Sequence, residues 1–240
     1  MLALATLAAT TFAAIQAPAR LLRQLFAWSS AAIALAMALH LLPGFHSAKL
    51  YDGVRFSAES VPFTASMNFD KGAAGLFILA AFSPRMRRLS DTSIFAMPRL
   101  WLLVAGTPVI VIAAALITGM IRFDPKFPEG AWVFMATNLL VTCVAEEAFF
   151  RGLIQERLTR LVEHRAHLHW MPVLISTTLF AMAHWGSGAM YLALVALAGL
   201  GYSLAYAVAR RIEAAIATHF ALNAVHFLLF TYPLATPSTI

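Results

Sequence analysis

The sequence has little charge and a single cysteine. Only 12% of its 240 residues are Asp, Glu, Lys or Arg, about half of the roughly 25% found in water-soluble domains. With 61% hydrophobic residues, the chain is neither an ordinary soluble domain nor a disordered one, since disorder needs low hydrophobicity. Cys143 alone excludes an intrachain disulfide and a metal site of several thiolates. We therefore expect a protein that lies in the lipid bilayer.

Acidic residues are the scarcer of the two charge types. Eleven Asp and Glu oppose 17 Lys and Arg, which gives a formal net charge of +6. Most of the basic residues fall in short polar breaks between apolar runs. This pattern is typical of membrane loops that face anionic lipid, and it does not favour a nucleic-acid partner.

The apolar runs predict an all-α fold, a polytopic transmembrane helix bundle of about eight spans, because a span needs about 20 residues. Residues 1–240 are expected to form a single membrane domain, with N-terminal spans in 1–121 and a catalytic core in 130–232. We interpret the first run as a span and not as a signal peptide, because no basic region precedes it. The candidate spans are residues 2–19, 22–43, 69–84, 99–121, 131–151, 169–186, 189–209 and 213–232.

The polar breaks indicate an orientation. Alternate breaks hold most of the basic residues, so the positive-inside rule places those breaks in the cytoplasm and both termini outside. The longest polar insert, residues 44–68, is expected to be an outward-facing loop that folds back onto the bundle. The residues assigned to the basic breaks are Arg20, Arg23, Arg85, Arg87, Arg88, Arg99, Arg151, Arg157, Arg160, Arg165, Arg210 and Arg211, and those assigned to the opposite side are Lys49, Arg55, Lys71, Arg122 and Lys126.

Two adjacent glutamates lie in the fifth apolar run. A charged side chain at mid-membrane depth costs at least about 2.5–3.5 kcal/mol and usually marks function. Glu147 and Arg151 are four residues apart, so they lie on one helix face and are expected to form an ion pair. Glu146 points about 100° away and is therefore the freer carboxylate, which favours it as a general base. The alternative is a helix end at which all three groups are solvated.

Histidines occur in two later runs. His219, Asn223 and His226 are spaced i, i+4, i+7 and form one polar stripe on the last predicted helix. A lone histidine in a membrane helix is more often a hydrogen-bonded packing residue than a catalyst, but unpaired polar groups are costly in lipid, so a stripe of them is notable. His184 lies near a predicted helix end, where a tight turn follows at residues 185–188.

Together, three motifs resemble the CPBP family of CAAX proteases and bacteriocin-processing enzymes. The family pattern is Glu-Glu-x-x-x-Arg, then Phe-x-x-x-His, then His-x-x-x-Asn, on successive membrane segments. The sequence matches at all defining positions and in the same order, over roughly residues 130–232. The matching residues are Glu146, Glu147, Arg151, Phe180, His184, His219 and Asn223.

The resemblance implies a glutamic intramembrane endopeptidase without a cofactor. Glu146 would activate the attacking water with help from His184, and His219 and Asn223 would stabilise the oxyanion. Glu147 and Arg151 would orient and support the site. Peptide hydrolysis needs these elements in any case: a base for water, an acid for the leaving amine, and donors for the oxyanion.

A zinc metalloprotease is the alternative mechanism. His184, His219 and Glu146 would then be the three protein ligands of the metal, with a water as the fourth. Against zinc, His219 is followed by Asn223 and not by a second histidine. Cys143 lies one turn before Glu146, but no general base is identifiable beside it, so we expect a packing role.

The predicted spans place the motifs at unequal depths. At 1.5 Å per residue, Glu146 lies roughly 8 Å and His219 about 10 Å above the basic face, but His184 lies about 20 Å above it. Since the base and its partner must approach each other, we expect the helix that carries Glu146 to begin later than Ala131 and to continue through Leu158. A late start of the next helix at Pro172, after a connection over residues 160–171, would have the same effect.

The expected substrate is a membrane-anchored protein or peptide. The short chain and the lack of a soluble domain suggest a bacterial protein of the inner (plasma) membrane, for which a substrate with its own membrane helix or tail is favoured over a prenylated one. An ion-coupled carrier that uses Glu146, Glu147 and His219 as a relay is a second hypothesis, although no repeat symmetry is visible. A catalytically inactive immunity protein is a third, although none of the motifs is broken.

Overall fold

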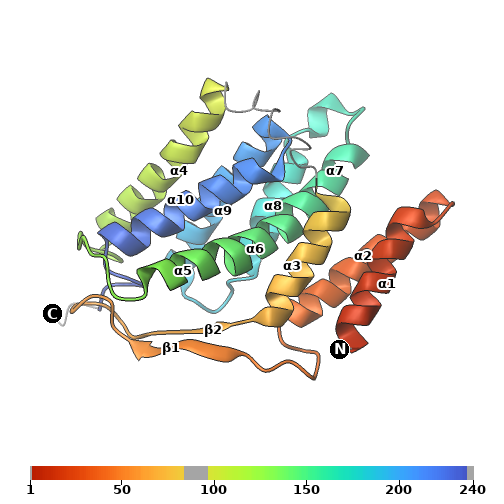
Figure 1. The fold of residues 1–240 in the computed structure, drawn as a ribbon. Helices are drawn as coiled ribbons and strands as arrows, with labels where there is room; N and C mark the ends of the chain where they lie inside the picture. Colours follow the sequence, from red (N-terminus) through yellow and green to blue (C-terminus); the bar gives the residue numbers. More distant parts are fainter. Residues whose placement is uncertain (1, 84–96, 237–240) are drawn as a thin grey trace.

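The N-terminal part of the molecule is a layer of three helices. The computed structural model describes residues 2–83 and 97–236. Helices α1 (Leu2–Gln16) and α2 (Arg20–Ala38) form a helical hairpin, and α3 (Phe69–Phe82) packs on both of them. Figure 1 shows α3 between this hairpin and the remaining helices, so α3 joins the N-terminal layer to the rest of the bundle.

The second part is built around one long helix. Residues Ala131–Leu161 run as a continuous helix of 31 residues, in which π-helical segments η2 (Asn138–Cys143) and η3 (Ala148–Gln155) alternate with α5 (Ala131–Thr137), α6 (Val144–Glu147) and α7 (Glu156–Leu161). Extra residues per turn of this kind occur frequently at functional sites. Helices α8 (Met171–Met182), α9 (Ala189–Ala209) and α10 (Ile212–Leu229) pack against it, and α4 (Pro98–Ile117) packs on α9 and α10.

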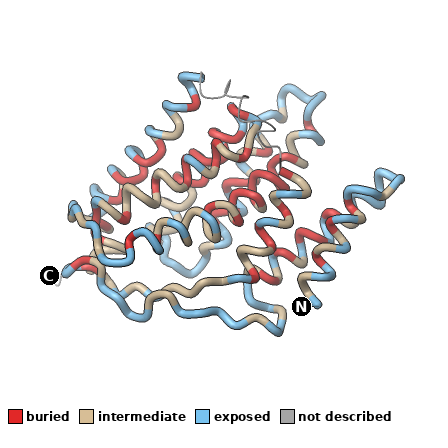
Figure 2. Tube along the Cα trace, in the orientation of Figure 1, coloured by how far each residue is buried: buried red, intermediate tan, exposed pale blue. Residues whose placement is uncertain are grey.

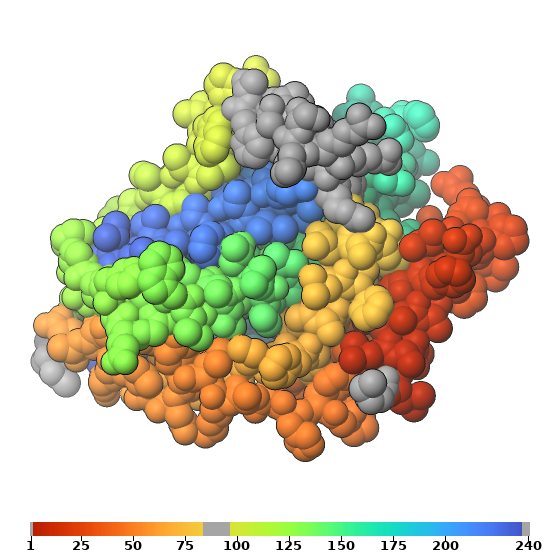
Figure 3. All heavy atoms as spheres, in the orientation of Figure 1, coloured from red at the N-terminus to blue at the C-terminus, as the bar shows by residue number. Residues whose placement is uncertain are grey.

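The prediction of an all-α fold misses one element. Residues 44–68 contain an antiparallel pair of strands, β1 (Ala48–Val54) and β2 (Phe63–Met67). As expected, this segment folds back onto the bundle: Phe56 and Phe63 pack on Phe134 of the long helix. The spheres of Figure 3 show the strands along one whole edge of the molecule, beneath the long helix and α3.

The predicted count of eight spans is not confirmed. Within the described residues, five helices are long and apolar enough to cross a membrane: α2, α4, Ala131–Leu161, α9 and α10. Helix α1 is apolar but has 15 residues, α3 has 14 and α8 has 12. These three coincide with the predicted spans 2–19, 69–84 and 169–186, whose apolar runs include residues that lie outside the helices.

Large apolar side chains cover the outside of the bundle. Leu102, Val109, Ile117 and Trp132 are all at least half exposed. Figure 2 shows buried residues on the inner faces of the helices and exposed ones on their outer faces. An apolar exterior of this extent suits lipid and not water. Together with the five long apolar helices, it indicates a multi-pass membrane protein.

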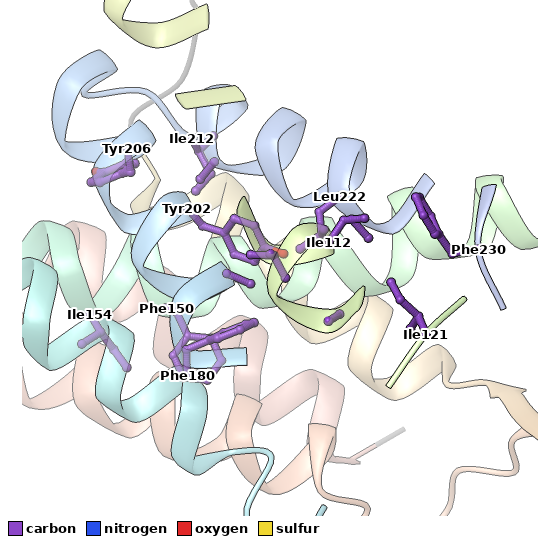
Figure 4. Close-up of a cluster of buried hydrophobic side chains, with 14 residues drawn as sticks. Ile112, Ile121, Phe150, Ile154, Phe180, Tyr202, Tyr206, Ile212, Leu222 and Phe230 are labelled. Carbon is purple, nitrogen blue, oxygen red and sulfur yellow. The ribbon is translucent and has the colours of Figure 1, made fainter. Parts of the chain in front are cut away.

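The aromatic core lies beside the long helix. Phe150 of the long helix packs edge-on against Phe180 of α8, with ring centroids 5.3 Å apart, and Phe180 contacts Tyr202 of α9. Figure 4 shows these three rings together at the centre of the largest buried cluster. These rings thus join the long helix, α8 and α9.

The arginine-rich connections lie at one end of the bundle, as the sequence predicts, with the exceptions given below. Figure 1 shows the turn after α1, the start of α4 and the connection after α7 away from the edge where the strands lie, and Gln24 of α2 bonds Arg157 of α7. At the opposite end, Glu59 of the strand segment pairs with Arg122. Arg85, Arg87 and Arg88 lie outside the described residues. Arg151 was assigned to a break but is fully buried within the long helix.

The structure removes the predicted mismatch in depth. The long helix begins at Ala131 and not later, so that expectation is wrong, but it does continue through Leu158, as far as Leu161. Helix α8 starts at Met171, with Pro172 in its first turn, as expected. Since α8 ends at Met182, His184 lies on the turn after the helix and not inside a span that reaches residue 186.

Candidate active site

The two motif residues Glu147 and Arg151 form the predicted ion pair. Arg151 Nη1 donates to Glu147 Oε1 at 3.2 Å, and both side chains are fully buried. Arg151 also donates to the Gly199 carbonyl oxygen at 2.8 Å, and its guanidinium lies 4.5 Å from the centre of the Phe180 ring. The buried guanidinium of Arg151 is therefore stabilised by a carboxylate of its own helix, an aromatic ring of α8 and a carbonyl oxygen of α9.

Glu147 also holds His219. The Nδ1 atom of His219, on α10, lies 2.8 Å from Glu147 Oε1, and its ring stacks on Tyr202 at 4.4 Å between centroids. Because an ionised carboxylate only accepts hydrogen bonds, Nδ1 must carry the proton. The opposite nitrogen, Nε2, is thus the atom of His219 that remains for other partners.

Glu146, which the sequence suggests is the freer of the two carboxylates, has one partner that the sequence did not predict. Its Oε1 atom lies 2.6 Å from the Nζ atom of Lys71 on α3, and both side chains are mostly buried. The sequence places Lys71 on the outward side, at the start of the predicted span 69–84. Its position directly before the apolar run 72–82 was the signal in the sequence, but no spacing rule relates two residues 75 positions apart.

His184 lies next to Glu146 at the end of α8. Its Nδ1 atom lies 3.0 Å from the Phe180 carbonyl oxygen. A carbonyl oxygen can only accept, so Nδ1 donates and Nε2 carries the lone pair in the neutral ring. The turn that follows contains Gly186 and Gly188 at positive φ, a conformation that glycine adopts without steric cost.

Asn223 is fixed by a residue that the motifs do not include. Its Nδ2 atom donates to Asn138 Oδ1 at 3.1 Å and lies 3.8 Å from Cys143 Sγ. Asn138 is the first residue of the π-helical segment η2. Cys143 is buried and its Sγ also contacts Asn138, which agrees with a packing role.

One cavity brings these side chains together. It has a volume of about 360 Å³ and is lined by Glu146, His184, His219 and Asn223, the four residues predicted to be catalytic. It continues to β1 and β2 and to Tyr232, where burial raises the pKa of the phenol, so this hydroxyl remains a hydrogen-bond donor. His226, the third member of the predicted stripe, also lines it and bonds the Thr231 carbonyl oxygen.

A second cavity lies on the other side of Glu146 and His184. It has a volume of about 250 Å³ and is lined mainly by apolar residues of α2 and α3. Glu146 and His184 contribute to both cavities. The carboxylate and the imidazole therefore lie between the larger cavity and the smaller one.

The alternative zinc ligands do not form a metal site. In residues 2–83 and 97–236, no group of three or more His, Cys, Asp or Glu side chains is arranged so that it could hold a metal ion. Glu146 is instead bound to a lysine, and His219 is bound to Glu147. The zinc alternative with these three ligands stays a prediction.

Comparison with known proteins gives one family. Residues 128–225 match the family described as type II CAAX prenyl endopeptidase Rce1-like. A search of curated proteins and a search of solved structures found no match. The matched segment begins before the long helix and ends within α10, so it contains all three motifs.

Proposed function

Since residues 128–225 belong to the Rce1-like CAAX protease family and the chain is thus a peptidase, we propose that it is an intramembrane endopeptidase of the glutamic type. The observation that carries the proposal is the convergence of Glu146, His184, His219 and Asn223 on one cavity inside a helical bundle with an apolar exterior. The proposed substrate is a peptide bond near the membrane-anchored end of a protein or peptide.

The first step is the attack of water on the scissile carbonyl carbon. Glu146 accepts one proton of the water as its oxygen bonds to carbon, and the carbonyl oxygen becomes an oxyanion. His184 assists through Nε2, because its Nδ1 proton is committed to the Phe180 carbonyl oxygen. A base positioned in this way contributes typically 10²–10⁴-fold to the rate.

The oxyanion is stabilised by His219 and Asn223. One Nδ2 hydrogen of Asn223 is bound to Asn138, and the other, which makes only a long contact of 3.8 Å with Cys143 Sγ, turns to the oxyanion. His219 donates from Nε2, which requires the imidazolium form because Nδ1–H already binds Glu147. The Glu147 carboxylate supports that positive charge. Breakdown of the tetrahedral intermediate then cleaves the C–N bond and transfers the proton from Glu146 to the leaving amine.

Replacement of the base tests the proposal. The membrane proteomes of cells with the wild-type protein and with Glu146→Gln should differ by a precursor that accumulates in the variant, and the purified wild-type protein should cleave that precursor. His184→Ala should abolish the same cleavage. Glu129→Gln, at an exposed glutamate, is the matched control and should cleave normally. Wild-type turnover by Glu146→Gln would refute the assignment of the base.

Chelation separates the two mechanisms. In the proposed mechanism the purified enzyme retains full activity after exhaustive treatment with a chelator. Loss of activity that zinc alone restores would instead favour the metalloprotease alternative, with His184, His219 and Glu146 rearranged as ligands.

A further inference from the structure

Lys71 is the one cationic partner of the proposed base among the described residues, and it comes from outside the family segment. Helix α3 lies before residues 128–225, yet the Lys71 ammonium lies 2.6 Å from Glu146 Oε1. The side chains are 22% and 15% exposed, respectively, so water screens this pair less than it screens a surface pair. The N-terminal part of the chain therefore contributes a charge directly to the site.

The packing of α3 brings this lysine into place. One turn after Lys71, Gly75 lies so close to the long helix that an added Cβ would be 2.4 Å from Ala145 Cα. Residue 75 thus allows the two backbones to approach directly beside Glu146. At the same helix start, the buried Asp70 accepts from the Lys71 backbone N–H and pairs with His40 at 2.7 Å, which fixes the beginning of α3.

We propose that Lys71 is a positioning residue that keeps Glu146 ionised and holds one of its oxygens, leaving the other oxygen to accept the proton of the attacking water. The inference rests on the proposed function, because it gives Lys71 a role through the base.

The other titratable groups around Glu146 do not replace the permanent positive charge of Lys71. Glu147, its neighbour on the helix, is an anion bound to Arg151 and His219, so it opposes ionisation of Glu146. His184 and His219 face the site from the turn after α8 and from α10, and Tyr191 faces it from α9. A histidine is neutral or charged according to pH, whereas a lysine is cationic over the whole physiological range. Without Lys71, burial favours the protonated acid, which cannot accept a proton from water.

Carbodiimide labelling tests the inference without a substrate. Dicyclohexylcarbodiimide is apolar and modifies protonated carboxyl groups. Mass spectrometry measures the modification at Glu146 as the sum of two products: the reagent adduct and any isopeptide cross-link to residue 71. At neutral pH we expect Lys71→Met to be labelled at Glu146 roughly tenfold more than the wild type, because the loss of the neighbouring positive charge favours the protonated carboxyl group that the reagent modifies. Lys71→Arg, which keeps the charge, should label within about twofold of the wild type.

The matched control is Lys49→Met. Lys49 forms an exposed pair with Asp52 on β1, so this variant should label at Glu146 as the wild type does. Equal labelling of Lys71→Met and wild type would overturn the inference. Should Lys71→Met fail to fold, Lys71→Gln is compared with Lys71→Arg in the same experiment, and equal labelling of these two variants would likewise overturn it.

Activity gives a second, independent readout on the precursor identified with Glu146→Gln. We expect kcat/KM of Lys71→Met to fall at least about tenfold at neutral pH and to recover at alkaline pH, where Glu146 ionises without a partner, while Lys71→Arg stays active. Faster cleavage by Lys71→Met would show that the lysine blocks the site, and would overturn the inference. An active Glu146→Gln protein would instead refute the proposed function, whatever the labelling shows.

Discussion

At the scale of single residues, one buried oxygen organises the site. Glu147 Oε1 accepts from Arg151 and from His219, so the carboxylate joins a structural cation to a proposed catalytic imidazole. Its Oε2 is buried and has no hydrogen-bond partner among residues 2–83 and 97–236. The hydrogen bonds of the Glu147 side chain are thus made by Oε1, so removal of the carboxylate affects Arg151 and His219 together.

Loss of the Glu147 carboxylate should therefore damage stability and activity at once. We expect Glu147→Ala to lower the free energy of unfolding by about 3–5 kcal/mol, because it leaves the buried Arg151 without its anion, and to inactivate the enzyme. Thermal unfolding of the detergent-solubilised protein measures the first effect, with Glu129→Ala as the exposed control. An inactive Glu147→Ala protein as heat-stable as the wild type would contradict this structural role.

Asn138 should control the orientation of Asn223. We expect Asn138→Leu to lower kcat by about tenfold or more, since a single misplaced oxyanion donor costs 10²–10³-fold when it is removed entirely, while KM changes little. Asn138→Asp keeps an acceptor for Asn223 Nδ2 and should retain more activity. Equal kcat values for Asn138→Leu and the wild type would show that Asn223 needs no support from this residue.

Whether a contact of the site could be predicted depends on how far apart its two residues lie in the sequence. The ion pair of Glu147 and Arg151 depends on one helical turn, which the sequence specifies. Lys71 and Asn138 reach their partners across 75 and 85 positions, and such contacts depend on how α3 and α10 pack on the long helix. The convergence of the three motifs was expected from the family resemblance and not from any spacing.

At the scale of elements, long apolar runs were predicted best. The predicted span 189–209 coincides with α9, because its ends are marked by Gly188 and by Arg210. Residues 44–68 were expected to form a loop since they are polar, but Phe63-Thr64-Ala65-Ser66-Met67 alternates between apolar and polar residues, which is the period of a strand. The helix from Ala131 is longer than its apolar run 131–151, because its last stretch, Gln155 to Arg160, is polar. Hydropathy assigns this stretch to a loop, and only the comparison of motif depths indicated that the helix continues through Leu158.

The close packing of α3 on the long helix makes its own prediction. Gly75→Val should separate these helices, because even a Cβ at residue 75 meets Ala145 backbone, and we expect lower thermal stability together with increased carbodiimide labelling of Glu146 as Lys71 withdraws. Gly106→Ala is the control: no atom of the part of the chain that the structure describes lies within 4 Å of the added Cβ, and alanine favours helix over glycine by roughly 1 kcal/mol. This control should be as stable as the wild type or more so. Unchanged labelling in a folded Gly75→Val protein would show that Lys71 does not depend on the close approach.

At the scale of the whole molecule, the two ends differ in charge and in structure. One end carries short turns with Arg20, Arg23, Arg165 and Arg210, and the other carries the strands and the last described residues, where Val61 N–H bonds the Leu234 carbonyl oxygen. The larger cavity extends from the proposed catalytic groups to β1 and β2. Water for hydrolysis would thus reach Glu146 from the end where the strands lie.

Labelling from the two sides of the membrane tests this arrangement. The positive-inside rule places the arginine-rich end in the cytoplasm, so a cysteine at Arg165 should react with an impermeant maleimide only after the membrane is opened, and a cysteine at Asp52 should react in intact cells. Both positions are exposed, and the buried Cys143 contributes little background. Reaction of both cysteines from the same side would contradict the alternation of the helices. Reaction of each from the side opposite to that expected would preserve the fold but turn the mouth of the larger cavity, and with it the access of water and substrate, toward the cytoplasm.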